Sequence, residues 1–422
     1  MNRFPLPTTR AQVSGHKFLV RRLEHGLVTG DTRLIHDPLG RRRRGILFGV
    51  AGCVLAGLAA GAMAVFVPEP DPGDAAVVRA ESGALYSRVD GKLHPVGNLT
   101  SARLIAGSAV EPVAAADSVL SGMERGVPVG IPGAPGPVVG EVPDGLVWGV
   151  CQSATDITVT VGPPPAEPSP GSGVLARVNG VDHVITAEGR ITLPDPSTRF
   201  GRVLRRRLGI SPHTPIWEPP PEILNAIREL PRYVRPPNSG VLLGNGRESW
   251  LLRPDGILPV TPLQRGILLD LGASERAVPQ DGPAARPDAS PEDIRLPRTD
   301  LEWLDPRAVT VCAVGDAGRL GIVDASTEEA GATGIYVPGA GVALSGDSVA
   351  TRYASVLVNG IGVDTGHGHY LVSDSGLRHP VGGVEELGVI GVREPLPAPW
   401  PIIRLLPAGE ALTRDRALEP RY

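Results

Sequence analysis

The sequence is poor in cysteine, aromatic residues and lysine. Three of the 422 residues are cysteines and 4% are aromatic, while lysine occurs only at Lys17 and Lys92. With so few aromatics, any core must be built from Val, Leu, Ile and Ala. The same scarcity argues against a sugar-binding surface, because such surfaces usually stack the sugar on Trp or Tyr.

Sequence motifs of common catalytic sites are also absent. The chain contains no G-x-x-x-x-G-K-[ST], G-x-S-x-G or H-E-x-x-H, and its single Gly-Lys pair is Gly91-Lys92. His367 and His369, with Asp364 nearby, lie in a Gly-rich stretch that favours a loop over a metal site. We therefore predict no catalytic residues and no metal ligands, and no cofactor follows from the residues.

The longest apolar run covers residues 46–67, 22 residues without a charge, directly after Arg41, Arg42, Arg43 and Arg44. A helix of that length rises about 33 Å and can cross a hydrocarbon layer about 30 Å thick. The alternative is a cleavable signal peptide, since Ala62-Met63-Ala64 resembles a cleavage site. However, 45 residues precede the run, and signal peptides have a shorter apolar core. We predict a transmembrane helix.

Charge is distributed unevenly about this run. Residues 1–44 hold ten basic and three acidic residues, a net charge of +7, while the whole chain carries −4 and the remainder therefore −11. Arginines beside a span favour the cytoplasmic side. We predict a single-pass inner-membrane protein with a cytoplasmic N-terminus and a periplasmic C-terminal domain. The basic segment is expected to meet lipid or a protein partner, and we predict no nucleic-acid partner.

Two cysteines, Cys151 and Cys312, lie in the exported part, each in an apolar stretch that is typical of a buried strand. Two cysteines in an oxidising compartment predict a disulfide. No second Cys or His stands at ligand spacing beside either one, which argues against zinc. A catalytic thiol is the weaker alternative for an exported pair.

An internal repeat is visible when the chain is aligned on Gly91, Gly189, Gly256 and Gly376. Each copy has an alternating strand, a turn with Gly and a second strand, and a helix-like segment follows in several copies. The intervals of 98, 67 and 120 residues exclude a solenoid or propeller of fixed period. We interpret the pattern as an internal duplication, two halves of two repeats and one core region each, which the disulfide joins.

These observations predict an α+β fold, a mostly β exported domain of four small repeats around a central β core, plus one N-terminal transmembrane helix. The expected boundaries are 1–44 for the cytoplasmic segment, 45–67 for the span, 75–125, 174–235, 240–278 and 350–394 for repeats one to four, 126–162 and 300–345 for the two parts of the core, and 395–422 for an extended Pro-rich strap.

Residues 9–31 predict an amphipathic helix in the cytoplasmic segment. Thr9 and Gln12 stand at capping-box spacing. An amphipathic helix close to a membrane either lies on the bilayer or docks on a protein, and the modest apolar face favours docking. The expected docking residues are Phe18, Val20, Leu23 and Leu27.

Several motifs together resemble the EccB family, the B components of type VII (ESX) secretion systems of actinobacteria. They are TTRAQVSGHKFLVRRLEHGLVTGD at 8–31, DPLGRRRRG at 37–45, the single apolar run, LYSRVDGKLHPVGNLTSARLI at 85–105 and GIPGAP at 130–135. The resemblance implies a structural subunit of an inner-membrane secretion complex, with four periplasmic repeats about a disulfide-linked core. Implied partners are the multi-spanning D component, the FtsK/SpoIIIE-like ATPase C, the E component, the mycosin protease and further copies of the chain.

Some members of that family carry an ATPase label, so ATP is implied as a cofactor by the label alone. Without a nucleotide motif, we predict a non-enzymatic scaffold, with ATP hydrolysis as the alternative. A module that binds envelope glycans is the second alternative. The sequence leaves the stoichiometry, the secreted substrates and the particular paralogous system undetermined.

Overall fold

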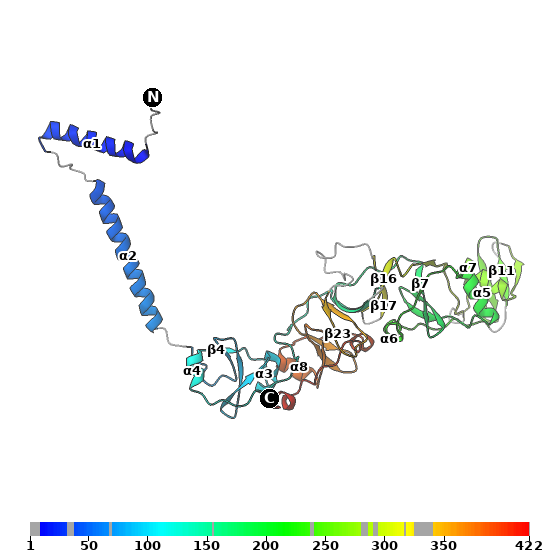
Figure 1. Ribbon diagram of the computed structural model, residues 1–422. Helices are drawn as coiled ribbons and strands as arrows, with labels where there is room; N and C mark the ends of the chain where they lie inside the picture. Colours follow the sequence, from blue (N-terminus) through cyan, green and yellow to red (C-terminus); the bar gives the residue numbers. More distant parts are fainter. Residues whose placement is uncertain are drawn as a thin grey trace, which may run out of the picture. The chain divides into compact units, whose positions relative to one another are not determined.

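The computed structural model describes residues 9–31, 38–66, 70–153, 156–236, 240–279, 286–289, 294–315, 318–324 and 341–421. They belong to two compact units, Met1–Pro70 and Asp71–Tyr422, called here the N-terminal and C-terminal units. In Figure 1 the N-terminal unit is blue and the C-terminal unit takes the colours from cyan to red.

The N-terminal unit consists of α1 (Arg10–Thr29) and α2 (Pro38–Phe66). The predicted capping box is present: Thr9 Oγ1 accepts from the Gln12 backbone N–H, and Gln12 Oε1 accepts from the Thr9 N–H at 2.9 Å. Gly30 ends α1 in the left-handed region at φ +67°, which glycine adopts without steric cost. Within α2, Arg43–Met63 is long and apolar enough to cross a membrane, and none of that stretch is buried against protein.

Four sheets of the C-terminal unit share one topology, in which three antiparallel strands are followed by a helix and a fourth strand parallel to the first. Repeat one is β1 (Val77–Ala80), β2 (Leu85–Val89), β3 (Lys92–Val96), α3 (Leu99–Ala106) and β4 (Val113–Ala115). Repeat two is β7 (Ser172–Val178), β8 (Val181–Thr186), β9 (Gly189–Thr192), α5 (Arg199–Arg207) and β10 (Ile216–Trp217). Repeat three is β11 (Val241–Gly244), β12 (Ser249–Arg253), β13 (Gly256–Val260), α7 (Pro262–Asp270) and β14 (Ser274–Ala277). Repeat four is β20 (Ile361–Asp364), β21 (His369–Val372), β22 (Arg378–Val381), α8 (Val384–Ile390) and β23 (Leu396–Pro397).

Each repeat also has a return segment that runs parallel to its third strand. The bridges are Leu93 with Arg125, Arg190 with Glu229, Ile257 with Asp288, and Arg378 with Ala408. A short helix follows the fourth strand in repeats one, two and four, namely α4 (Asp117–Ser121), α6 (Pro221–Ala226) and α9 (Trp400–Ile403). The repeat is therefore longer than the strand–turn–strand–helix pattern that the sequence reveals.

The central sheet has the order β17-β16-β5-β6-β19-β18. Its strands are β5 (Val147–Gln152), β6 (Ile157–Gly162), β16 (Val309–Val314), β17 (Arg319–Asp324), β18 (Val342–Ala343) and β19 (Arg352–Ser355). β19 lies in this sheet although the sequence places residues 350–394 in repeat four. A further strand, β15 (Glu302–Trp303), joins β7 of repeat two rather than the central sheet.

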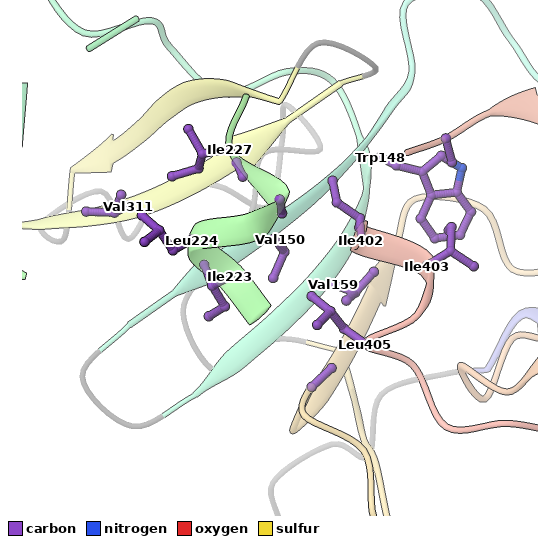
Figure 2. Packing of buried hydrophobic residues seen from close by; sticks show 14 of the residues in the cluster. Trp148, Val150, Val159, Ile223, Leu224, Ile227, Val311, Ile402, Ile403 and Leu405 are labelled. Atoms are coloured by element: carbon purple, nitrogen blue, oxygen red, sulfur yellow. The ribbon is translucent and has the colours of Figure 1, made fainter. Parts of the chain in front are cut away.

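The main hydrophobic core lies on one face of the central sheet. Figure 2 shows Ile223 and Leu224 of α6 and Ile402 and Ile403 of α9 packed against Val150, Val159 and Val311 of the sheet. All of these side chains are at most 4% exposed. The core is largely aliphatic, as the scarcity of aromatics predicts, with Trp148, Trp217 and Tyr353 as buried exceptions.

The C-terminal region 395–422, expected to be an extended strap, instead holds β23, α9 and α10 (Arg414–Ala417). Proline is compatible with this arrangement because α9 has Pro399 at its N-cap and Pro401 in its first turn, where no intrahelical N–H donor is needed. The positions of these two prolines therefore mark the start of α9 and do not exclude a helix.

Candidate functional site

The two cysteines of the C-terminal unit form a disulfide at the middle of the central sheet. Cys151 on β5 and Cys312 on β16 are directly opposite each other in the antiparallel register, with Cα atoms 4.0 Å apart. β6 flanks β5 and β17 flanks β16, so two hairpins from distant parts of the chain meet at this bond. The arrangement is the one expected of two duplicated halves joined at a shared centre.

The segments that precede β16 and β5 make matching contacts with the repeats. Glu302, shortly before β16, pairs in parallel with Ser172 at the start of repeat two. Val138, shortly before β5, pairs in parallel with Gly360 at the start of repeat four. Each core region is thus linked to the start of the repeat that follows the other core region by the same kind of contact, which agrees with a duplication.

Repeats one and four pack together through one hydrophobic cluster. Buried side chains of α3, including Leu104 and Ile105, lie with Leu387 and Ile390 of α8 and with Leu412. Arg103 of α3 is 8% exposed and donates from Nη1 to the Ile390 carbonyl oxygen at 2.9 Å. These contacts join segments almost 300 residues apart in the sequence.

The C-terminal residues add polar contacts to this pair. Arg421 donates from its backbone N–H to the Pro128 carbonyl at 2.8 Å and from Nε to the Gly130 carbonyl at 2.9 Å. Its Nη2 lies 2.8 Å from a carboxylate oxygen of Glu410. The GIPGAP motif at 130–135 therefore belongs to the junction between repeat one and the C-terminal segment.

Repeats two and three pack together through a second cluster, which includes Leu204 of α5 and Ile267 of α7. Asp270 at the end of α7 accepts from Arg206 at 2.6 Å and from Arg207 at 2.7 Å. The hydrogen bond from Arg207, with that from Arg206, holds the pKa of Asp270 below its ordinary value. Repeat one thus pairs with repeat four, and repeat two with repeat three.

The four aligned glycines occupy two kinds of position. Gly91 lies inside the β2–β3 turn at φ +82°, beside Asp90 at φ +49°, and Gly376 lies in a turn at φ +82°. Gly189 and Gly256 instead begin β9 and β13, where a side chain would overlap the carbonyl of the return segment, Arg228 or Pro287 respectively. The turn between β12 and β13 consists of residues 254–255, and Gly256 follows it as the first residue of β13.

The large apolar side chains of α1 are exposed within the N-terminal unit, except Phe18, which is half-buried. At about 100° per residue, Val20, Leu23 and Leu27 lie within an arc of about 60°. Phe18 lies roughly 140° from Leu23, outside that stripe. Val13 and Leu19 lie near the stripe and are 43% and 56% exposed. The α1 stripe, defined as Val13, Leu19, Val20, Leu23 and Leu27, is thus a surface available for a partner.

All four arginines that precede the apolar run lie on α2. The side chains of Arg43 and Arg44 are exposed. The side chains of Arg41 and Arg42 lie outside the described residues. In the part of the chain that the structure describes, no group of three or more His, Cys, Asp or Glu could hold a metal ion. His369 Nε2 is 3.9 Å from Asp364.

The Gly91-Lys92 pair has no phosphate-binding geometry around it. Lys92 begins β3, directly after a two-residue hairpin turn, and its ammonium group lies 3.5 Å from Glu124. Both side chains are more than half exposed. A phosphate cradle requires several backbone N–H groups that converge at a helix N-terminus, and this strand turn offers none.

Comparison with known proteins relates the whole chain to one family. Residues 6–421 match the family model described as "Type VII secretion system ESX-1, transport TM domain B". The chain is 28% identical to the Mycobacterium tuberculosis protein named "ESX-1 secretion system ATPase EccB1", over 97% of this chain and 94% of the relative. It is 29% identical to the Mycolicibacterium smegmatis "ESX-3 secretion system ATPase EccB3", over 97% and 90%.

Solved structures agree with the fold. A chain of an intact ESX-5 inner-membrane complex aligns over 99% of this chain and 97% of its own length, with a TM-score of 0.66 and 25% identity. An EccB3 dimer from an ESX-3 core complex aligns over 82% of this chain and 100% of its own, with a TM-score of 0.67 and 23% identity. The latter likeness concerns the fold alone.

Proposed function

This chain belongs to the EccB family of the type VII (ESX) secretion system, and from that premise we propose that it is a structural single-span subunit of the ESX inner-membrane complex. The observation that carries the proposal is the extent of the match, which includes α1, the apolar helix and all four repeats. A match to the repeats alone would leave the membrane role open, whereas this one covers both units.

The proposed orientation places α1 in the cytoplasm and the C-terminal unit in the periplasm. Arg43 and Arg44 directly precede the apolar stretch, and positive residues beside a span favour the cytoplasmic side. The Cys151–Cys312 disulfide supports the other half of the proposal, since disulfides persist in oxidising compartments. We expect alkaline phosphatase to be active when it is fused to the C-terminus of the full-length chain and inactive when it is fused to the N-terminus of the same chain. The reverse pattern would refute the orientation.

The proposed partners are the other components of the complex and further copies of the chain. We assign the α1 stripe to a cytoplasmic component and the C-terminal unit to self-association and to periplasmic components. The wider set comprises the D component, ATPase C, the E component and the mycosin protease. Purification of the tagged full-length protein in mild detergent, followed by identification of the co-purifying proteins, tests this assignment. Recovery of the chain alone as a monomer would contradict it.

ATP hydrolysis is the second candidate, because relatives carry "ATPase" in their names. The geometry around Gly91-Lys92 does not favour it, since Lys92 is paired with Glu124 and exposed. We expect full-length protein freed of ATPase C to show no ATP turnover above that of a Lys92→Ala variant. Turnover that persists through purification and is lost in Lys92→Ala would establish the activity instead.

A further inference from the structure

One buried histidine connects repeats one and four through both of its ring nitrogens. His379 on β22 is 0% exposed. Its Nδ1 lies 2.8 Å from the carbonyl oxygen of Glu410, and its Nε2 lies 3.1 Å from the carbonyl oxygen of Gly133. Gly133 belongs to the GIPGAP segment after repeat one, and Glu410 follows the return segment of repeat four. The ring therefore lies between two backbone segments that are far apart in the sequence.

The chemistry of imidazole gives this geometry a consequence. A neutral ring has one N–H donor and one nitrogen that only accepts, while a carbonyl oxygen can only accept. A neutral His379 can therefore bond to Glu410 or to Gly133, and its other nitrogen then faces an oxygen without a hydrogen between them. The charged imidazolium has two N–H donors and satisfies both carbonyls.

Repeat one contains the matched position, which lacks the second contact. His94 on β3 stands before Pro95 as His379 stands before Pro380, and its Nδ1 lies 3.0 Å from the Val127 carbonyl. Glycine leaves room for the ring in both repeats, at Gly126 and at Gly409. Among the described residues, no hydrogen bond reaches Nε2 of His94, which is half-buried. His94 therefore needs only one N–H donor, and a neutral ring provides it.

Few charged groups lie on the elements that surround the His379 ring. The loop 131–134 carries none. The segment 408–412 carries Glu410, whose carboxylate is paired with Arg421. On β22, Arg378 is the adjacent residue of the strand and places its guanidinium 5.3 Å from the Trp400 ring centroid.

The other neighbouring elements contribute four more groups. On β21, His369 lies 3.9 Å from Asp364. On α10, Arg414 donates to the Ile105 carbonyl at 3.3 Å, Arg416 lies 3.1 Å from Glu419, and Asp415 is exposed to solvent. Since the nearby charges are paired or exposed, the two carbonyl oxygens are the groups that respond to the proton on His379.

We propose that His379 is a proton-sensitive latch between repeats one and four. Protonation closes the latch because the ring then donates to both Glu410 and Gly133, and loss of the proton releases one of the two. The stabilisation is therefore present while the ring carries its proton and is lost when rising pH removes that proton. The proposal concerns the C-terminal unit alone and holds on either side of a membrane.

The experiment uses the full-length protein in mild detergent at several pH values from 5.5 to 8. Amide hydrogen exchange of the peptide that covers residues 128–135 is measured by mass spectrometry and corrected for the intrinsic pH dependence. We expect protection of this peptide in the wild type to increase about tenfold or more as the pH falls, the effect of one hydrogen bond to a charged group. The increase should be absent in His379→Gln and retained in His94→Gln.

Exchange of the histidine C2 hydrogen in the wild type gives a second, variant-free measurement and decides the matter if His379→Gln does not fold. It reports the protonation of His379 and His94 separately in the same sample. The expected result is that protection of residues 128–135 follows the titration of His379. An equal pH response in the wild type and His379→Gln, or protection that rises while the His379 ring remains neutral, would overturn the latch.

Discussion

At the scale of single residues, aligned glycines meet different constraints. Gly91 needs only its left-handed backbone, since an added Cβ meets nothing within 4 Å. At Gly256 the Cβ would overlap the Pro287 carbonyl, so the return segment must move. We expect Gly91→Ala to cost about 1 kcal/mol of unfolding free energy and Gly256→Ala roughly 3 kcal/mol. Denaturant unfolding of both variants measures the difference, and equal losses would show that Gly256 is merely a turn residue.

Asp182 on β8 is a buried carboxylate held by two arginines. Its side chain is 9% exposed, 2.7 Å from Arg177 and 3.0 Å from Arg205. Burial alone raises the pKa of Asp182, but the hydrogen bonds from Arg177 and Arg205 outweigh it, and the net pKa lies below the ordinary value. A carboxylate with a lowered pKa contributes stability above its unfolded pKa, which is lost as the pH falls through the folded pKa.

The predicted consequence is a pH-dependent loss in Asp182→Asn. At pH 7 the variant should unfold about 2 kcal/mol more readily than the wild type, because two guanidinium groups lose a charged acceptor. The difference should shrink as the pH falls below about 4, where the carboxylate takes up a proton in the unfolded chain. It should disappear below the lowered folded pKa of Asp182, where the carboxylate is neutral in the folded wild type as well. Glu248→Gln, an exposed position, is the control and should change little. A difference that stays constant down to pH 2 would exclude the ionised carboxylate as its cause.

At the scale of elements, the sequence predicts α1, but the four expected docking residues do not share one face of it. The capping box of Thr9 and Gln12 and the terminal Gly30 fix the helix ends, and both can be identified in the sequence. Phe18 is an expected docking residue, but the helix carries it away from the α1 stripe. Val13 and Leu19 could have been found by the same angular argument, because only the helix period is needed.

The α1 stripe predicts a specific assembly defect. Leu23→Glu with Leu27→Glu places two charges on the stripe, and we expect at least a tenfold loss of co-purifying complex components. The control, Ser14→Glu with His25→Glu, adds the same charges to the opposite face and should leave recovery unchanged. Both variants keep the helix ends intact. Quantitative mass spectrometry after affinity purification compares them, and equal recovery from both would remove the docking role of the stripe.

The strands of the repeats were only partly predictable. The hairpin of the second and third strands is visible because its residues alternate and its turn contains Gly. The fourth strands are short, for example Leu396–Pro397 and Ile216–Trp217, and two residues carry no periodicity. β19 was placed in repeat four because it lies close to that repeat in sequence, whereas its partner is β6, almost 200 residues earlier. Such long-range pairing leaves no local pattern.

At the scale of the whole C-terminal unit, the two halves of the chain are interlocked. The disulfide is predictable from the sequence, since the expected exported part holds two cysteines, each in a strand-like apolar stretch. The pairing of repeat one with four and two with three was not, because it depends on which apolar faces match in space. Every repeat packs on a repeat from the other half. In the central sheet, the β5–β6 hairpin of the first half lies between β16 and β19 of the second half.

This interlocking predicts that neither half folds alone. A break within residues 237–239 separates repeats one and two from repeats three and four, and each fragment then lacks both of its packing partners. We expect the two fragments, co-expressed, to purify together and to be joined through Cys151 and Cys312, while each expressed alone is insoluble. Reduction should lower the melting temperature of the assembled pair, since the bond also links the fragments covalently. A stable, folded monomer of either fragment would show that the pairs are dispensable, and the duplicated halves would then be independent domains rather than parts of one core.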